Sequence, residues 1–135
     1  MKIRCERDTL VDAVATAQRA VANRTGAPPV LSDLRITATA DGIELVGSDL
    51  EITNRVHAPA EVERTGVAVI PKILGEIVRR LNGAVTIEVE EGEATITSGD
   101  FSTTLRLKHA EEYPRIAPSD GAGVRIDANT FAGAL

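Results

Sequence analysis

The sequence predicts an α+β fold in which two helices pack on one face of an antiparallel sheet. Residues 34–39, 43–45 and 85–90 alternate apolar and polar side chains, which is the period of a half-buried strand. Residues 9–22 and 71–83 instead place their apolar side chains at the spacing of one helix face. Antiparallel strands with one apolar face need a covering layer, and these two helices are the segments that can provide it.

Composition indicates a soluble intracellular protein with an aliphatic core. The chain has 135 residues, of which 43% are hydrophobic and only 2% are aromatic. This length can bury a core of Val, Ile, Leu and Ala, and the scarcity of aromatic residues argues against base stacking as a binding mode. The single cysteine, Cys5, cannot form an internal disulfide and is expected to be buried. Because the N-terminus lacks an apolar segment, we expect no signal peptide or membrane span, and a cytoplasmic location.

The N-terminal half is expected to contain a strand, a helix and three further strands. Residues 2–6 form the first strand, and Asp8 or Thr9 caps the helix that follows. After the strands over 34–39 and 43–45, the sequence Gly47-Ser48-Asp49 allows a bend or bulge. A third strand is expected to carry Leu50, Ile52 and Val56.

The C-terminal half is expected to contain a second helix between further strands. Residues 58–65 are interpreted as a polar connection and residues 66–70 as a buried strand. Pro71 then begins the second helix, because proline is favourable at the first helical position. The buried stripe of this helix is expected to be Ile73, Leu74, Ile77 and Leu81. Strands over 85–90, 94–97 and 101–107 follow.

The last stretch of the chain repeats the first. Residues 123–135 align with residues 2–14 without a gap. The alignment places Arg125 on Arg4, Asp127 on Glu6, Thr130 on Thr9 and Phe131 on Leu10. A repeat at this scale indicates a second copy of one domain. We therefore expect a first domain over 1–117, a linker over 118–122 and, over 123–135, the strand and first helical turn of a homologous domain. The chain is interpreted as the N-terminal piece of a longer polypeptide.

The sequence offers little support for catalysis. It contains no helical His–Glu metal pair, no cysteine pair, no phosphate-binding glycine loop and no Gly-x-Ser-x-Gly motif. A remote alternative is a hydrolase that uses Ser48 or His57, which requires these residues to converge in one pocket. We therefore predict no catalytic residue, no metal site and no cofactor.

Basic residues gather on the two predicted helices and the loop after the first. The net charge of −5 disfavours nucleic acid as a partner, but a segregated charge distribution can outweigh the sum. These residues are Arg19, Arg24, Lys72, Arg79 and Arg80. If the helices pack side by side, their outer faces form a positive surface that can contact phosphates without reading base sequence. Asp12 and Glu76 weaken this signal, and the alternative is a β-rich protein-interaction module without DNA binding, whose basic helices only aid solubility.

Four segments, taken in order, resemble the first domain of the bacterial DNA sliding clamp family, the beta subunit of DNA polymerase III. They are PPVLSDLRI, DGIELVGSDLEI, VIPKILGEIVRRL and ITSGDFSTTLRLKHAEEYP. The resemblance covers essentially the whole chain and implies a DNA-clamp (processivity-fold) domain without catalysis. In this family two subunits close into a ring whose inner wall is lined by helices. The ring encircles duplex DNA and tethers the polymerase during DNA replication.

The resemblance also implies roles for individual residues. By position, Arg24, Lys72 and Arg79 match residues that the family places against DNA, and helix geometry adds Arg19 and Arg80. The segment 101–107 matches the edge that pairs with the third domain of the partner subunit. The interface residues are then Phe101, Thr103, Leu105 and Leu107.

The implied partners are duplex DNA, DNA polymerase III and the clamp loader, without a membrane. All of them require the full-length ring, which a homodimer forms. A fragment of this length cannot close a ring, and we expect it to show little stable association with DNA.

Overall fold

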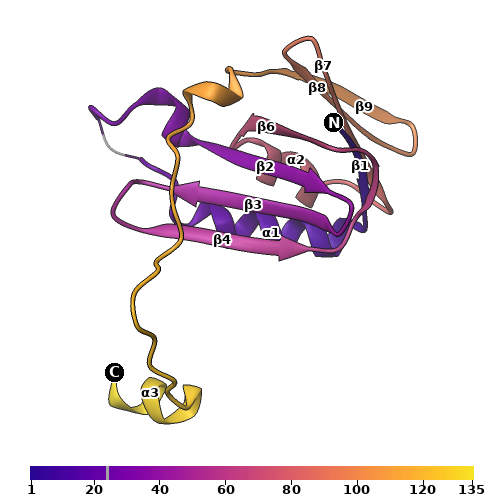
Figure 1. Cartoon of the computed structure of the whole chain (residues 1–135). Coiled ribbons are helices and arrows are strands. Elements are labelled where there is room, and N and C mark those ends of the chain that lie inside the picture. Colours follow the sequence, from indigo (N-terminus) through magenta and orange to yellow (C-terminus); the bar gives the residue numbers. More distant parts are fainter. Residues whose placement is uncertain (24) are drawn as a thin grey trace.

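The strands form two antiparallel sheets. The computed structural model describes residues 1–23 and 25–135. The five-stranded sheet has the order β5-β1-β7-β8-β9 and the four-stranded sheet has the order β4-β3-β2-β6 (Figure 1). The first comprises β1 (Lys2–Cys5), β5 (Glu61–Arg64), β7 (Val85–Glu90), β8 (Glu93–Ser98) and β9 (Phe101–Arg106). The second comprises β2 (Asp33–Thr39), β3 (Gly42–Ser48), β4 (Thr53–Ala58) and β6 (Gly66–Pro71). The predicted α+β class and antiparallel pairing are confirmed.

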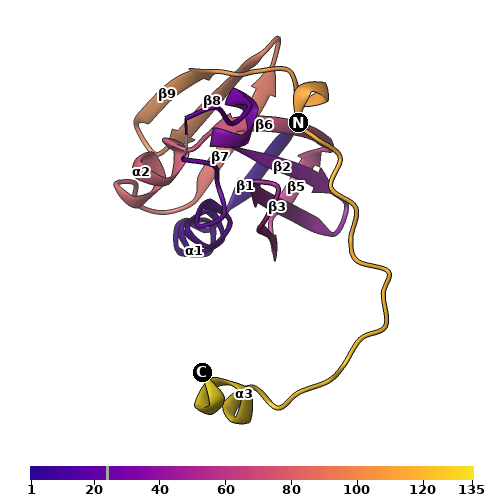
Figure 2. The same cartoon turned by 90° about the vertical axis from the view of Figure 1, so that its left-hand side faces the viewer.

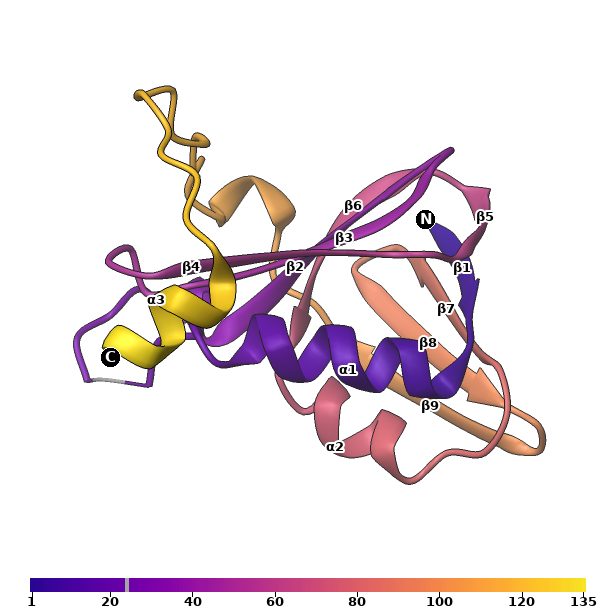
Figure 3. The same cartoon turned by 90° about the horizontal axis from the view of Figure 1, so that it is seen from below.

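Two helices lie side by side against the sheets. The longer one, α1 (Arg7–Gln18), lies on β3 and β4 and packs along α2 (Leu74–Arg79) (Figures 2 and 3). Together with both sheets they enclose one core, whose described residues include no aromatic side chain. Its largest fully buried side chains include Ile3, Leu10, Leu34, Ile36, Leu45, Ile70, Leu74, Ile87 and Ile96. The predicted aliphatic core is confirmed.

Gly47 allows α1 to approach the four-stranded sheet closely. A Cβ atom at this position would lie 2.0 Å from the carbonyl oxygen of Ala17, well inside van der Waals contact. The bend predicted over 47–49 begins later, because β3 continues through Gly47 to Ser48 and the turn starts at Asp49. The glycine is required by the packing of the helix on the strand.

Two strand predictions need correction. The third strand of the hairpin begins at Thr53, and Leu50 and Ile52 are exposed in the turn before it. In this turn the carboxylate of Asp49 accepts the backbone N–H groups of Glu51 and Ile52, a local pattern that competes with strand pairing. The predicted polar connection 58–65 contains the edge strand β5. Its side chains are mostly charged, so it lacks the alternation of apolar and polar residues from which strands were predicted.

The helices are shorter than predicted. Pro71 pairs with Asp33 in the ladder between β2 and β6, so α2 begins three residues later and Ile73 is 51% exposed. At its N-terminus α1 begins directly after Glu6, whose carbonyl accepts the N–H of Leu10. The predicted side-chain cap by Asp8 or Thr9 is therefore wrong. The same helix ends at Gln18 rather than near residue 22.

The segment after β9 crosses the outer side of the four-stranded sheet. The ammonium of Lys108 lies 2.7 Å from the buried carboxylate of Asp33, which joins the end of the five-stranded sheet to β2. Further on, Tyr113 is buried in a second apolar cluster that includes Val46 and Val69, and this burial raises the pKa of its phenol. Arg55 then donates a hydrogen bond to the carbonyl of Ile116.

The C-terminal stretch extends away from the sheets (Figure 1). Residues 123–127 pair with no strand in the described part of the chain, and α3 (Ala128–Ala134) follows. Asp127 caps this helix, because its carboxylate accepts the N–H of Thr130 at 3.0 Å, and these hydrogen bonds lower the pKa of the carboxyl group. The domain boundaries stay predictions. None of the described helices is long and apolar enough to cross a membrane.

Candidate nucleic-acid interface

The helix pair is fixed by hydrogen bonds at both of its ends. At one end, the amide of Gln18 donates to the carbonyl of Lys72 at 2.9 Å. At the other end, the guanidinium of Arg7 donates to the carbonyl of Arg79. The C-terminus of α1 therefore lies beside the residues that precede α2, and the two helices run antiparallel.

The sequence-predicted basic residues occupy both ends of this pair. All four that the structure describes, Arg19, Lys72, Arg79 and Arg80, are exposed. Arg24, the fifth predicted residue, lies outside the described residues. The hydrogen bond from Gln18 to the carbonyl of Lys72 brings Arg19 and Lys72 to one end, whereas Arg79 and Arg80 lie at the other. We call the exposed surface of α1 and α2, together with the residues flanking their ends, the helix face.

The cations of the helix face differ in how they are paired. Arg79 forms an ion pair with Glu76, and Arg7 forms one with Asp8 at 2.7 Å. The ammonium of Lys72 instead donates to a neutral acceptor, the amide oxygen of Asn23, at 3.1 Å. Among the described residues, no carboxylate pairs with Arg19, Lys72 or Arg80. Three cations on this face therefore keep their charge uncompensated by an ion pair.

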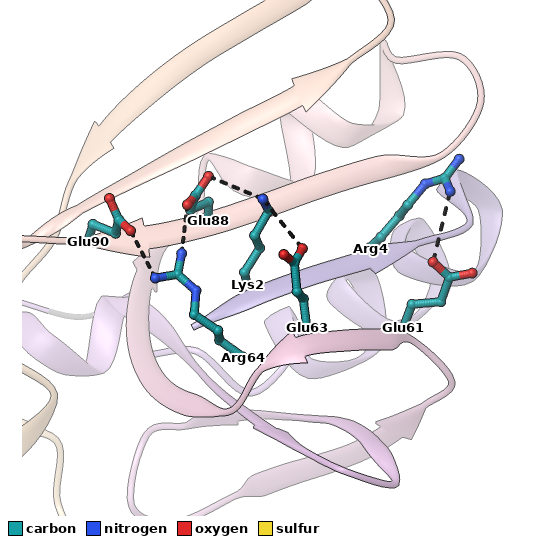
Figure 4. A network of polar contacts seen from close by, with 7 residues as sticks. All are labelled: Lys2, Arg4, Glu61, Glu63, Arg64, Glu88 and Glu90. Atoms are coloured by element: carbon teal, nitrogen blue, oxygen red, sulfur yellow. Dashed lines mark hydrogen bonds and ion pairs between the residues drawn. The ribbon is translucent and has the colours of Figure 1, made fainter.

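The outer face of the five-stranded sheet carries a chain of ion pairs from Glu90 to Glu63 and a separate pair of Arg4 with Glu61 (Figure 4). On this face Lys2 and Arg4 of β1 and Arg64 of β5 each pair with glutamates of β5 or β7. Arg106 at the end of β9 lies on the same face and forms no ion pair among the described residues. Arg64 contacts Glu88 at 2.6 Å and Glu90 at 2.9 Å, and the hydrogen bond to Glu90 raises the pKa of its guanidinium. We call this surface the strand face. Over β5, β1 and β7 its cations are matched by carboxylates.

The free edge of β9 adjoins a small apolar cleft. In the described chain β9 pairs only with β8, so its other backbone edge is open. Of the predicted interface residues, Phe101 is 43% exposed, whereas Thr103, Leu105 and Leu107 are half-buried. A cleft of about 230 Å³ lies between Phe101 and α2. It is lined by Ile73, Glu76, Ile77, Arg80, Leu81 and Phe101.

Comparison with known proteins identifies the domain. Residues 1–117 match the family model described as the DNA polymerase III beta subunit, N-terminal domain. The chain belongs to this family. It is 36% identical to the beta sliding clamp of Streptomyces coelicolor and 35% identical to that of Micrococcus luteus. Both alignments cover 100% of this chain, which spans 36% and 44% of those two proteins.

Solved structures of this family share the fold. Caulobacter crescentus pol III beta superposes with a TM-score of 0.88 at 28% identity, over 97% of this chain and 36% of that one. The DNA polymerase sliding clamp from Bacillus subtilis gives a TM-score of 0.82 at 30% identity, over 89% of this chain and 34% of that one.

The candidate catalytic residues do not form a site in this beta-subunit domain. Ser48 is buried, 2.8 Å from the hydroxyl of Thr53, and its oxygen accepts the N–H of Leu50. His57 is exposed on β4, four positions beyond Thr53, which places it roughly 13 Å away along the strand. Burial raises the pKa of the Cys5 thiol, which disfavours the nucleophilic thiolate. The hydrolase alternative is therefore wrong.

Sequence reasoning missed several residues of these surfaces. Ile73 was assigned to the buried stripe, yet it is exposed in the cleft beside Phe101. The roles of Gln18 and Asn23 could not be predicted from the sequence, because their shared partner Lys72 lies 54 and 49 residues away from them. Only the packing of the two helices brings these groups together.

Proposed function

We propose that this chain is the N-terminal domain of a cytoplasmic DNA sliding clamp, a non-catalytic processivity factor that encircles duplex DNA and tethers the replicative polymerase. Membership of the beta-subunit family supports this proposal. The observation that carries it is a contrast between the two faces. On the helix face three of the described cations have no ion pair, whereas Lys2, Arg4 and Arg64 on the strand face are paired with glutamates. A positive inner wall and a neutralised outer wall hold phosphates inside a ring.

In this function the helix face contacts the DNA backbone. Arg19, Lys72, Arg79 and Arg80, together with Arg24, bind phosphates loosely and without base contacts, so that the ring slides. Arg79 contributes least while Glu76 compensates its charge. Binding of this kind weakens steeply with salt.

The edge of β9 is the subunit interface of the homodimeric ring. Its open backbone groups pair with a strand of the partner subunit, and Phe101, Thr103, Leu105 and Leu107 lie along this edge. The adjacent cleft supports this assignment, because exposed Ile73 and Phe101 together form an apolar surface that a partner can cover. DNA polymerase III and the clamp loader act on the full-length ring.

The test is topological and uses the full-length protein with its loader. Encirclement predicts that the protein is retained on circular DNA and lost once the circle is cut, because a ring slides off a free end. Equal retention on both forms contradicts encirclement and favours the protein-interaction module. A full-length variant with Phe101→Asp tests the interface independently, since a monomer detected by sedimentation is then expected together with loss of retention on circles.

A further inference from the structure

Lys72 is held more firmly than an exposed lysine usually is. Its carbonyl accepts two hydrogen bonds, one from the N–H of Gly75 at 3.1 Å and one from the amide of Gln18 at 2.9 Å. Its ammonium donates to Asn23 at 3.1 Å. The backbone and the head group of this one residue are thus tied to the end of α1 and to the loop that follows it.

The side chain of Gln18 packs against a glycine of the second helix. A Cβ atom on Gly75 would lie 2.6 Å from Oε1 of Gln18, so the glycine in the first turn of α2 lets this amide lie close to the helix backbone. From this position Gln18 donates its hydrogen bond to the carbonyl of Lys72. This arrangement fixes the start of α2 relative to α1.

The ammonium of Lys72 donates to a neutral amide, although a carboxylate lies only four residues away in the sequence. Glu76 lies four residues after Lys72 but forms its ion pair with Arg79. Asn23 orients the ammonium without neutralising it, and an ammonium has three donors, of which Asn23 takes one. Two donors and a full positive charge are left for an oxyanion.

We propose that Gln18 and Asn23 are positioning residues that hold Lys72 on the helix face for contact with a duplex phosphate. This inference rests on the proposed function, since it assigns the phosphate contact to that surface. Holding the side chain in place before binding removes part of the ordering entropy that the contact would otherwise cost.

Side-chain NMR of the 135-residue chain tests the positioning directly, because the chain has only three lysines, Lys2, Lys72 and Lys108. Without DNA, the Lys72 head group is expected to be restrained in the wild type and released in Asn23→Ala and in Gln18→Ala. Stable association needs the closed ring, but weak binding in fast exchange is enough for this measurement. Titration with an excess of a short mixed-sequence duplex at low salt is therefore expected to shift the Lys72 signals and leave those of Lys2 unchanged.

Two substitutions at Asn23 separate position from charge. Asn23→Ala keeps the charge of Lys72 but frees it, so duplex affinity falls about twofold or more for one side chain that must be ordered on binding, with the salt slope unchanged. Asn23→Asp keeps the side chain in place but neutralises it, so the slope of log K against log salt falls by about 0.9, the value of one phosphate contact. Thr65→Asp adds the same charge between β5 and β6 and is expected to leave the slope unchanged.

The outcomes distinguish failure of the positioning role from failure of the proposed function on which it rests. A Lys72 head group that is mobile in the wild type, or wild-type affinity and slope in both Asn23 variants, overturns the positioning role while the proposed function stands. If the duplex perturbs no signal of the helix face at low salt, the phosphate-binding surface itself is wrong, and the inference fails with it. Because Asn23 is exposed, the amide spectra of the variants are expected to retain the wild-type fold.

Discussion

The helix face and the strand face carry similar charged side chains but pair them differently. On the strand face, antiparallel neighbours stand opposite one another, so Lys2 and Arg64 on adjacent strands both reach Glu88. On the helix face only local pairs form: Glu76 pairs with Arg79 three residues further along α2, and Asp8 pairs with the adjacent Arg7. The difference shows that pairing, more than the net charge of −5, decides where a polyanion can bind.

The largest effect is expected from separating the helix face from the sheet. Gly47→Ala places a Cβ atom where the carbonyl oxygen of Ala17 lies, so α1 must move off β3. We expect the free energy of unfolding to fall by about 3 kcal/mol, the upper range for overpacking. Urea denaturation measures this loss. Gly123→Ala is the control, because no atom lies within 4 Å of a Cβ atom there, and an equal loss in both variants contradicts the packing role.

A buried ion pair is expected to behave unlike the exposed pairs of the strand face. Asp33→Asn removes the charge that the Lys108 ammonium contacts at 2.7 Å, at a site where Asp33 is 4% exposed. The expected loss is about 1–3 kcal/mol, since a charged hydrogen bond is broken at a buried group. Glu63→Gln breaks the exposed contact with Lys2 and is expected to leave denaturation unchanged. Equal stability of both variants would show that burial does not matter here.

The outer side of the four-stranded sheet is expected to respond to alkaline pH. Because burial raises the pKa of Tyr113 in the folded state, its neutral form is favoured there. The resulting stability is fully present below the unfolded pKa of about 10 and is lost as the pH rises through the folded value. Tyr113→Phe is expected to lack this loss. Stability measured against pH in both proteins checks it, and the phenolate absorbance of the single tyrosine reports its titration.

The elements were predictable where local pattern and packing agree. Alternation in β2, β7 and β8 matched their burial, because each of these strands has one face on the core. In β3 it did not, because Val46 is buried in the second cluster with Tyr113 on the other face of the sheet. The division into two sheets was not predictable, since it depends on pairings such as β1 with β7 that link distant segments. Before β4, the apolar residues Leu50 and Ile52 predicted a strand, but hydrogen bonds to the carboxylate of Asp49 hold this segment in a turn.

The candidate site was predictable in composition but not in its pairing. Helical spacing was enough to place Arg19 and Arg79 on exposed faces. Which partner each cation takes was not predictable. Arg79 pairs with Glu76 and Lys72 donates to Asn23, and these contacts are set by which acceptors lie in reach once the helices have packed. The strength of each cation as a phosphate ligand therefore follows from tertiary structure.

Charge reversal on the two faces tests the comparison directly. Arg19→Glu places a negative charge on the helix face, so duplex affinity at low salt is expected to fall and the salt slope to decrease by about 0.9 or more. Arg64→Glu makes the same change on the strand face, where the cation is already paired with Glu88 and Glu90, and is expected to leave the slope unchanged. NMR titration of each variant across a salt series measures both. Equal effects would mean that only net charge matters.

The smallest effect is expected from releasing a paired cation within the helix face itself. Glu76→Gln removes the only carboxylate that the described residues place beside Arg79. Arg79 then becomes available to a phosphate, so duplex affinity rises and the salt slope increases by at most about 0.9, because one further contact is the most that one arginine can add. The matched control is Glu88→Gln on the strand face, which frees part of the Arg64 pairing without changing the helix face. If both variants bind alike, ion pairing does not tune the helix face, and the contrast between the two surfaces is one of position alone.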